Sequence, residues 1–89
     1  MSIKIIDSIS AAQCRGARGL LEISQTQLAK AASLSLSTIV DFEKSRRQVS
    51  NDAVRVIKAA LEDAGVDFID ENGGGPGVRL RKRQRPKSK

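Results

Sequence analysis

The sequence predicts a mainly α-helical fold that ends in a short β-ribbon and a basic tail. Between residues 8 and 64, apolar residues recur at helical spacing in four successive segments. A serine or asparagine that can cap a helix stands at the start of each segment. After Gly65, residues 66–69 are rich in strand-forming residues, and residues 78–81 alternate apolar and charged side chains, which is typical of a strand. We therefore expect four helices followed by two strands.

The composition restricts the chemistry available to the chain. Its 89 residues suit one small domain, and they include one Cys and no His, which excludes a zinc cluster or a disulfide framework. We expect no metal, no cofactor and no enzymatic activity, because His, Tyr and a convergent carboxylate pair are missing. Cys14 is expected to be a buried structural thiol. No apolar run could span a membrane and no signal peptide is apparent, so a cytosolic protein is expected.

The first helix is expected over residues 8–21. Three residues could cap its N-terminus: Asp7, Ser8 and Ser10. Four residues share one helical face: Cys14, Ala17, Arg18 and Leu21. Gly16 and Gly19 each weaken a helix by about 1 kcal/mol relative to Ala. We expect these glycines to allow close packing against a neighbouring element.

Two short helices follow. Ser24 and Gln27 form a capping box for the second helix. The inner face of that helix is Leu28, Ala29 and Ala32. After a connector over residues 33–35, Ser35 caps a third helix over residues 36–44. The core-facing stripe of the third helix is Ile39, Phe42 and Glu43.

The last part of the chain contains a fourth helix and the ribbon. Ser50 or Asn51 caps a helix over residues 51–64, and Gly65 ends it. Residues 66–69 and 78–81 are expected to pair across a glycine-rich turn over residues 72–77. The ribbon residues expected to face the core are Val66, Phe68, Val78 and Leu80. Residues 82–89 are expected to be disordered.

The second and third helices resemble the helix-turn-helix of the Xre/Cro-type regulators of bacteria and phages. The resemblance is carried by Ser24, Gln25, Leu28, Ala29, Ala32, Leu34, Ser35, Thr38, Ile39, Phe42 and Glu43. It covers about residues 12–64, and residues 65–81 look like the ending of small single-domain members. It implies a four-to-five-helix lambda-repressor-like DNA-binding domain over residues 1–81, with the basic tail over residues 82–89. Four positions depart from the usual pattern: Ser33, Leu36, Asp41 and Ser45.

The resemblance implies that the third helix enters the major groove of double-stranded DNA. The expected DNA-facing residues are Ser24, Gln25, Ser35, Leu36, Ser37, Thr38, Asp41, Lys44, Arg46 and Arg47. For Gln25 and for the basic residues after the third helix, the expected role is phosphate contact, and the alternative is simple solvation. Leu36 is either a partner for a thymine methyl or one exposed leucine. Asp41 either accepts from a cytosine amino group or orients Arg46 or Arg47.

Arg18 and Glu43 are charges at core-facing positions of the first and third helices. Because a buried charge needs a partner, and because the family pairs these two positions, we expect a salt bridge between them.

The charge is unevenly distributed along the chain. Residues 1–60 hold nine bases and five acids, residues 61–72 hold five acids and no base, and residues 73–89 hold seven bases and no acid. The basic tail is either an arm on phosphates or in a minor groove, or a solubilising tail without contacts.

The function expected from these features is a sequence-specific DNA-binding transcriptional regulator in the cytosol of a bacterial or phage host. A homodimer on a palindromic operator is expected, with its contacts in the ribbon or in residues 3–6. The alternative is an antitoxin or another protein-interaction module in which DNA binding is secondary. Co-purification of a second polypeptide would favour that alternative.

Overall fold

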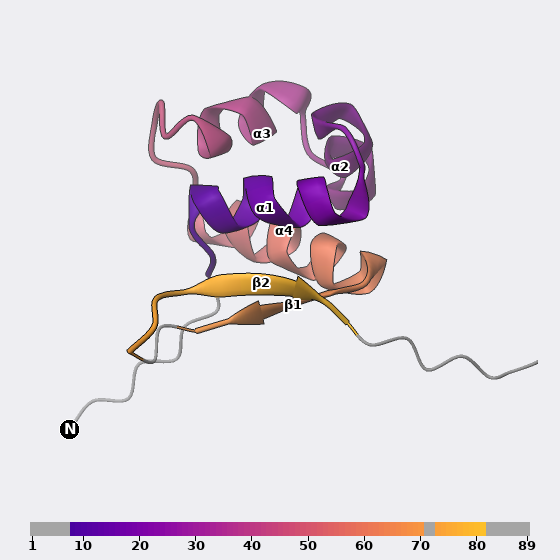
Figure 1. Ribbon diagram of the computed structural model, residues 1–89. Coiled ribbons are helices and arrows are strands. Elements are labelled where there is room, and N and C mark those ends of the chain that lie inside the picture. Colours follow the sequence, from indigo (N-terminus) through magenta and orange to yellow (C-terminus); the bar gives the residue numbers. More distant parts are fainter. Residues whose placement is uncertain (1–7, 71–72, 82–89) are drawn as a thin grey trace, which may run out of the picture.

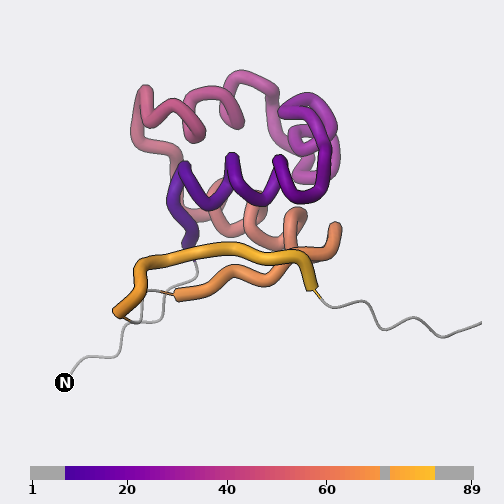
Figure 2. Tube along the Cα trace, in the orientation of Figure 1, coloured from indigo at the N-terminus to yellow at the C-terminus, as the bar shows by residue number. Residues whose placement is uncertain are grey.

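The computed structural model describes residues 8–70 and 73–81. Within them lie four helices and two strands: α1 (Ala11–Leu21), α2 (Gln25–Ala32), α3 (Leu36–Glu43), α4 (Asn51–Ala64), β1 (Val66–Ile69) and β2 (Gly77–Leu80). The helices pack together, and the antiparallel ribbon of β1 and β2 lies along one side of them, next to α1 and α4 (Figure 1). After α4 the chain turns back, and the ribbon that follows packs against α1 (Figure 2). The prediction of a mainly α-helical chain with a small ribbon is confirmed.

Three of the sequence expectations lie outside the described residues. These are the Asp7 cap, a dimer contact through residues 3–6 and the disorder of residues 82–89. In the described part of the chain, no helix has the length and apolar character needed to cross a membrane.

A serine caps each of the four helices. In every case the Ser Oγ accepts a hydrogen bond from the backbone N–H three residues later, which satisfies one amide of the first turn. The four caps are Ser10, Ser24, Ser35 and Ser50. The first helix therefore begins at Ala11 and not at residue 8, because Ser10 and Gln13 form a capping box at that point.

Three residues other than glycine adopt a left-handed backbone just after α1, α2 and α3. Glu22 follows α1 with a φ of 59°, and Ser33 follows α2 with a φ of 58°. Ser45 adopts a φ of 54° just after α3. This conformation normally favours glycine and costs a residue with a Cβ roughly 1 kcal/mol. Ser33 and Ser45 stand where the family that the sequence resembles usually has glycine. Both residues therefore bear this conformational cost. The third helix ends at Glu43 and not at residue 44, because Lys44 is its C-cap.

The helices enclose one small core. Its buried apolar residues include the inner faces expected for α1, α2 and α4: Cys14, Ala17, Leu28, Ala29, Ala32, Val54, Ile57 and Leu61. From α3, Ile39 is fully buried and Phe42 is partly buried against the same cluster. The helical faces expected from the sequence are therefore the faces that pack.

The ribbon attaches to the helices mainly through α1. Val66 pairs with Leu80, and Phe68 pairs with Val78, so these four side chains share the inner face as expected. Gln13 donates a hydrogen bond from Nε2 to the carbonyl oxygen of Gly77 at 2.9 Å. Leu80 lies on this inner face, but its side chain is 52% exposed at the end of the strand. The expectation that Leu80 is part of the core is therefore wrong. The second strand also begins one residue earlier than expected, at Gly77.

The two glycines of α1 differ in their surroundings. A Cβ built on Gly16 would lie 3.3 Å from Val78 Cγ1, so the ribbon packs closely there as expected. A Cβ on Gly19 would meet nothing within 4 Å, so the expectation of close packing at Gly19 is wrong. Only Gly16 has a packing reason to lack a side chain.

We expect Gly19→Ala to raise the free energy of unfolding by about 0.5–1 kcal/mol, because alanine lowers the entropy of the unfolded chain without a clash. Gly16→Ala serves as the matched comparison in the same helix. It should give little or no gain, because Val78 must shift to admit the methyl group. Urea unfolding measures both values, and an equal gain at the two positions would contradict this account.

Candidate functional site

The carboxylate of Glu43 is the most deeply buried charge in the described residues. Glu43 is the last residue of α3 and is 2% exposed. Arg18 of α1 donates to both of its oxygens, from Nε to Oε2 at 2.6 Å and from Nη2 to Oε1 at 2.7 Å. A two-point contact of this kind is among the stronger arrangements of an ion pair. The expected Arg18–Glu43 salt bridge is confirmed, and the side chain of Arg18 keeps 21% of its surface exposed.

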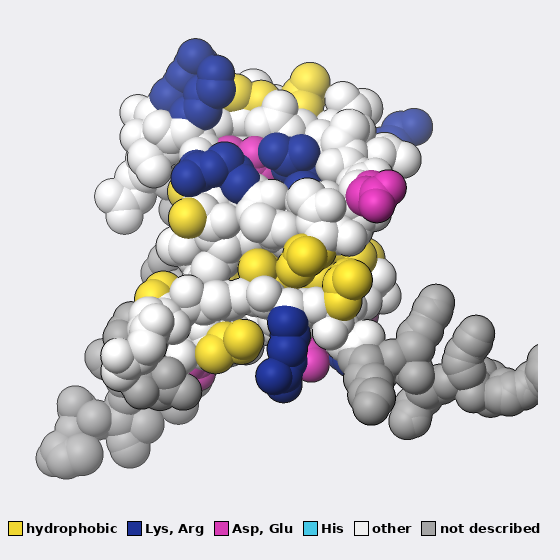
Figure 3. Space-filling view, in the orientation of Figure 1, with side chains coloured by type: hydrophobic (Ala, Val, Ile, Leu, Met, Phe, Trp, Pro, Cys, Tyr) yellow, Lys and Arg dark blue, Asp and Glu magenta, His cyan; other side chains and the backbone are white. Residues whose placement is uncertain are grey.

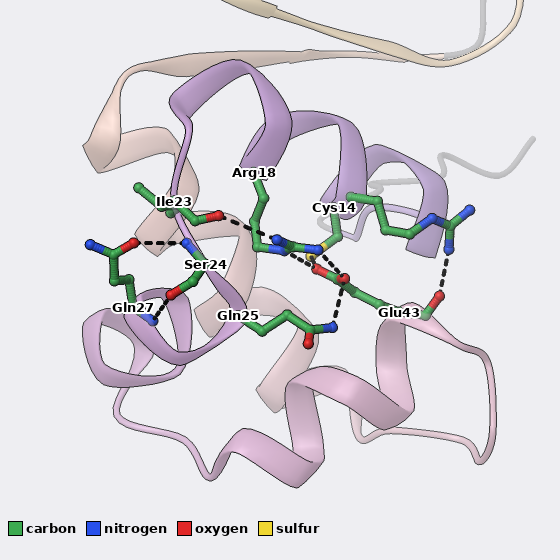
Figure 4. A network of polar contacts seen from close by, with 8 residues as sticks. Cys14, Arg18, Ile23, Ser24, Gln25, Gln27 and Glu43 are labelled. Atoms are coloured by element: carbon green, nitrogen blue, oxygen red, sulfur yellow. Dashed lines mark hydrogen bonds and ion pairs between the residues drawn. The ribbon is translucent and has the colours of Figure 1, made fainter.

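Two further groups reach the same carboxylate. The thiol of Cys14 donates to Oε2 with a sulfur–oxygen distance of 3.2 Å. The side-chain amide of Gln25, the first residue of α2, donates to Oε1 at 3.0 Å. Figure 4 shows these side chains converging between α1, α2 and α3. The carboxylate therefore connects three helices through four hydrogen bonds.

This environment changes the pKa of the three ionisable groups in the network. Burial alone would raise the pKa of the Glu43 carboxyl, but the hydrogen bonds from Arg18, Cys14 and Gln25 hold it below its usual value. The hydrogen bond to Glu43 raises the pKa of Arg18. Burial, followed by the contact with Glu43, raises the pKa of the Cys14 thiol. Cys14 is thus a protonated hydrogen-bond donor, as its expected structural role requires.

Arg15 is a contributor that the sequence reasoning missed. Its Nη1 donates to the backbone carbonyl oxygen of Glu43, at the C-terminal end of α3. Arg15 and Arg18 lie three residues apart on α1 and so project from neighbouring positions on its surface. This three-residue spacing was the signal in the sequence that could have identified Arg15, because it places the guanidinium groups of Arg15 and Arg18 on the side of α1 that meets Glu43.

Gln25 is one of the residues that are expected to contact a phosphate group. One of its two amide hydrogens is used by Glu43, so the second hydrogen and the carbonyl oxygen remain available by stoichiometry. The contact with Glu43 restrains the rotamer of this half-buried side chain. Its neighbour Ser24 caps α2 and is part of the capping box with Gln27.

The first turn of α3 is polar and exposed. Ser35 Oγ lies 3.2 Å from Ser37 Oγ and 2.9 Å from Thr38 Oγ1, which forms a small hydroxyl cluster. Leu36 beside it is 45% exposed, so it faces outward as expected. Asp41 was also expected to face outward, but its side chain is only 20% exposed. Asp41 is partly buried because arginine side chains from the following loop lie against it.

The loop after α3 presents three exposed bases, Lys44, Arg46 and Arg47. Arg47 Nε donates to Asp41 Oδ2 at 2.8 Å, and Arg46 Nη1 lies 3.9 Å from Asp41 Oδ1. One of the two roles considered for Asp41, the orientation of a basic neighbour, therefore agrees with the geometry. In the space-filling view, basic side chains gather over the part of the molecule that contains α1 and α3 (Figure 3).

The ten expected site residues fall into two groups at the two ends of α3. Ser35, Leu36, Ser37 and Thr38 stand at its start. The second group surrounds its end and comprises Ser24, Gln25, Asp41, Lys44, Arg46 and Arg47. The Gln25–Glu43 hydrogen bond places the beginning of α2 beside the end of α3. An eight-residue helix, about 12 Å long, thus separates an exposed hydroxyl-rich turn from a basic end.

Within residues 8–70 and 73–81, no three acidic, Cys or His side chains gather as a metal site would require. Comparison with protein-family models and with curated proteins finds no match for this chain.

We expect Arg18→Met to lower the free energy of unfolding by about 3–5 kcal/mol, because it leaves the buried Glu43 carboxylate without its counter-charge. Arg55→Met is the matched control, since Arg55 pairs with Asp52 on the surface of α4. That exposed pair should be worth less than about 1 kcal/mol. Urea unfolding at neutral pH compares the two variants, and similar small losses would contradict the central role of the buried pair.

The contribution of Glu43 should depend on pH in a defined direction. Its folded pKa is lowered, so its stabilisation is fully present above the unfolded value of about 4.3 and disappears as the pH falls through the folded value. The difference in unfolding free energy between wild type and Glu43→Gln should therefore be constant near neutral pH and shrink in acid. Chemical unfolding at a series of pH values measures this difference. Two parallel curves down to about pH 3 would contradict the assignment.

Proposed function

We propose that this chain is a sequence-specific DNA-binding transcriptional regulator in which α2 and α3 form a helix-turn-helix of the Xre/Cro type. It acts in the cytosol of a bacterial or phage host and binds a palindromic operator as a homodimer. The observation that carries the proposal is the hydrogen bond of 3.0 Å between Gln25 and Glu43. It holds a phosphate-binding amide beside the basic loop, while the first turn of α3 stays open.

The exposed first turn of α3 supports direct contact with base edges. The N-terminal residues of a recognition helix meet the bases in the major groove. Leu36 offers an apolar surface to a thymine methyl, and Ser37 can donate to or accept from several bases. Leu36 therefore contributes more discrimination between base pairs than Ser37 does.

The other end of α3 supports contact with the phosphate backbone. Gln25 can donate its second amide hydrogen to a phosphate oxygen, and Arg46 and Arg47 bring positive charge to the same end. Asp41 lowers the net charge but holds the two guanidinium groups in place. Phosphate contacts of this kind set the position of the protein on the duplex and carry no sequence information themselves.

A short helix reads too few base pairs for useful specificity by itself. Two copies on half-sites about 10 base pairs apart supply the missing contacts. The proposal therefore includes a homodimer and a palindromic operator.

We expect Leu36→Ala to weaken binding to an operator that the wild-type protein selects from a pool of random duplexes. The expected loss is about 1–3 kcal/mol, with affinity for unrelated duplex almost unchanged. Arg46→Ala should instead weaken binding to both duplexes and flatten the slope of log K against log salt by about 0.9. Val56→Ala is the control for Leu36→Ala, because Val56 is an exposed apolar residue on α4. Fluorescence anisotropy titrations at several salt concentrations measure all four proteins.

A uniform loss for Leu36→Ala on selected and unrelated duplexes would contradict the assignment of α3 as the reading helix. Failure of the wild-type protein to select any duplex would contradict the proposed function. A stable complex with a second polypeptide, combined with that failure, would favour the antitoxin-type interaction module.

A further inference from the structure

One edge of the ribbon carries backbone groups that have no partner within the described residues. The N–H of Arg81 donates to the carbonyl oxygen of Gly65 at 2.7 Å, and these residues continue the register of the ribbon. Hydrogen-bonded and non-hydrogen-bonded pairs alternate in an antiparallel ladder. The N–H and C=O groups of Val78 and Leu80 therefore point away from β1. This outer edge of β2 is ready to pair with another strand.

The outer edge of β1 is in a different state. Arg81 crosses the ribbon, where its Nε donates to Asp67 Oδ1 at 3.0 Å and its Nη2 donates to the carbonyl oxygen of Val66 at 2.9 Å. That carbonyl oxygen lies on the outer edge of β1 by the same alternation. The Arg81 side chain thus covers the Val66 end of the β1 edge, whereas no side chain of the described residues bonds to the outward groups of the β2 edge.

Apolar side chains flank the open edge. Gln13 and Gly16 of α1 contact Gly77 and Val78 in turn, so one face of α1 follows β2. Leu20 is one turn further along the same face. Their spacing from Gly16 and Val78 puts Leu20 and Leu80 at one end of the seam between α1 and β2, where Leu20 is 40% exposed and Leu80 is 52% exposed. Figure 3 shows apolar side chains gathered where α1 and the ribbon meet.

We propose that the open edge of β2 binds the β2 edge of a second copy of this chain, forming a continuous four-stranded antiparallel sheet. Val78 then lies opposite Leu80 of the second copy, and their outward backbone groups form the new ladder. Each Arg79 lies near the two-fold axis and keeps Asp67 of its own ribbon, at 4.0 Å, as its counter-charge. Leu20 and Leu80 of both copies are covered beside the new strand pair.

The choice of a second copy as the occupant rests on the proposed function. Strands that pair edge to edge in this way are related by a two-fold axis perpendicular to the sheet. The helices lie on one face of the ribbon, and α3 lies far from it (Figure 1). The axis therefore keeps both α3 helices on the same side of the sheet, where one duplex can meet both. A pairing through the outer faces of two ribbons would direct the α3 helices to opposite sides.

The experiment compares three variants with the same change in charge: Leu20→Glu, Leu80→Glu and Val56→Glu. Each of the first two places a charged side chain among the apolar groups that the new strand pair would cover. The third is the control, because Val56 is 41% exposed on α4 and outside the seam. Sedimentation equilibrium of the full chain without DNA should show a wild-type dimer, loss of the dimer in the two seam variants and a normal dimer in the control. Circular dichroism confirms that each variant is folded.

Amide hydrogen exchange adds a readout that identifies the edge. In the dimer, the N–H groups of Val78 and Leu80 should be protected, and dilution or Leu80→Glu should remove that protection. The N–H of Arg79 faces β1 in the ladder, so its protection should persist in the monomer.

Three outcomes would overturn the inference. They are a wild-type monomer at every concentration, a dimer that survives both seam variants, and protection of Val78 and Leu80 in a monomer, which would mean that another strand of the same chain occupies the edge. A dimer that behaves as expected but selects no duplex would support the inference and reject the proposed function. Duplex selection by a monomer would reject the inference and the homodimer, and it would support DNA recognition through α3.

Discussion

The arrangement of the first three helices depends on one buried negative charge. Glu43 has almost no contact with solvent, so its carboxylate is tolerable only with hydrogen-bond donors and a counter-charge. Arg18 supplies the charge from α1, and Cys14 and Gln25 supply further donors from α1 and α2. Because these donors are directional, they define where α3 ends relative to both neighbours. An apolar residue at position 43 would fill the space without this directional restraint.

The restraint matters because α3 has little else to hold it. It has eight residues, of which Ile39 is fully buried and Phe42 is partly covered. The Ser35 cap secures its first turn, and Arg15 holds a carbonyl group at its last turn. A helix anchored in this way at its C-terminal end can leave its first turn in solvent. The same contacts that stabilise the core thus prepare the surface on which the proposed function depends.

The two proposals concern opposite ends of the molecule and have different physical origins. The surface around α3 is polar and basic, and its long side chains suit a charged partner. The β2 edge offers directional backbone groups and two exposed leucines, which suit a strand of the same kind. A two-stranded ribbon is also marginal in water by itself. Its packing on α1 and pairing with a second copy would stabilise it from two directions.

The sequence by itself determined the features that depend on neighbours within one or two helical turns. The capping box of Ser24 and Gln27 and the buried stripes of the helices follow from spacing along a few residues. The Arg18–Glu43 pair could be foreseen because both charges occupied core-facing positions and because the family that the sequence resembles pairs these positions.

With the exception of the Arg18–Glu43 pair, only the tertiary structure decided the contacts between residues distant in the chain. Nothing in the local pattern indicated that Gln25 would meet Glu43, that Gly16 would touch Val78 while Gly19 would touch nothing, or that Leu80 would stay half exposed. Helical and strand periodicity specifies which face of an element is apolar. It does not specify how far along that face a neighbour extends. That distance depends on how side chains from several elements fill the same space, and so it is decided only when the helices and the ribbon pack together.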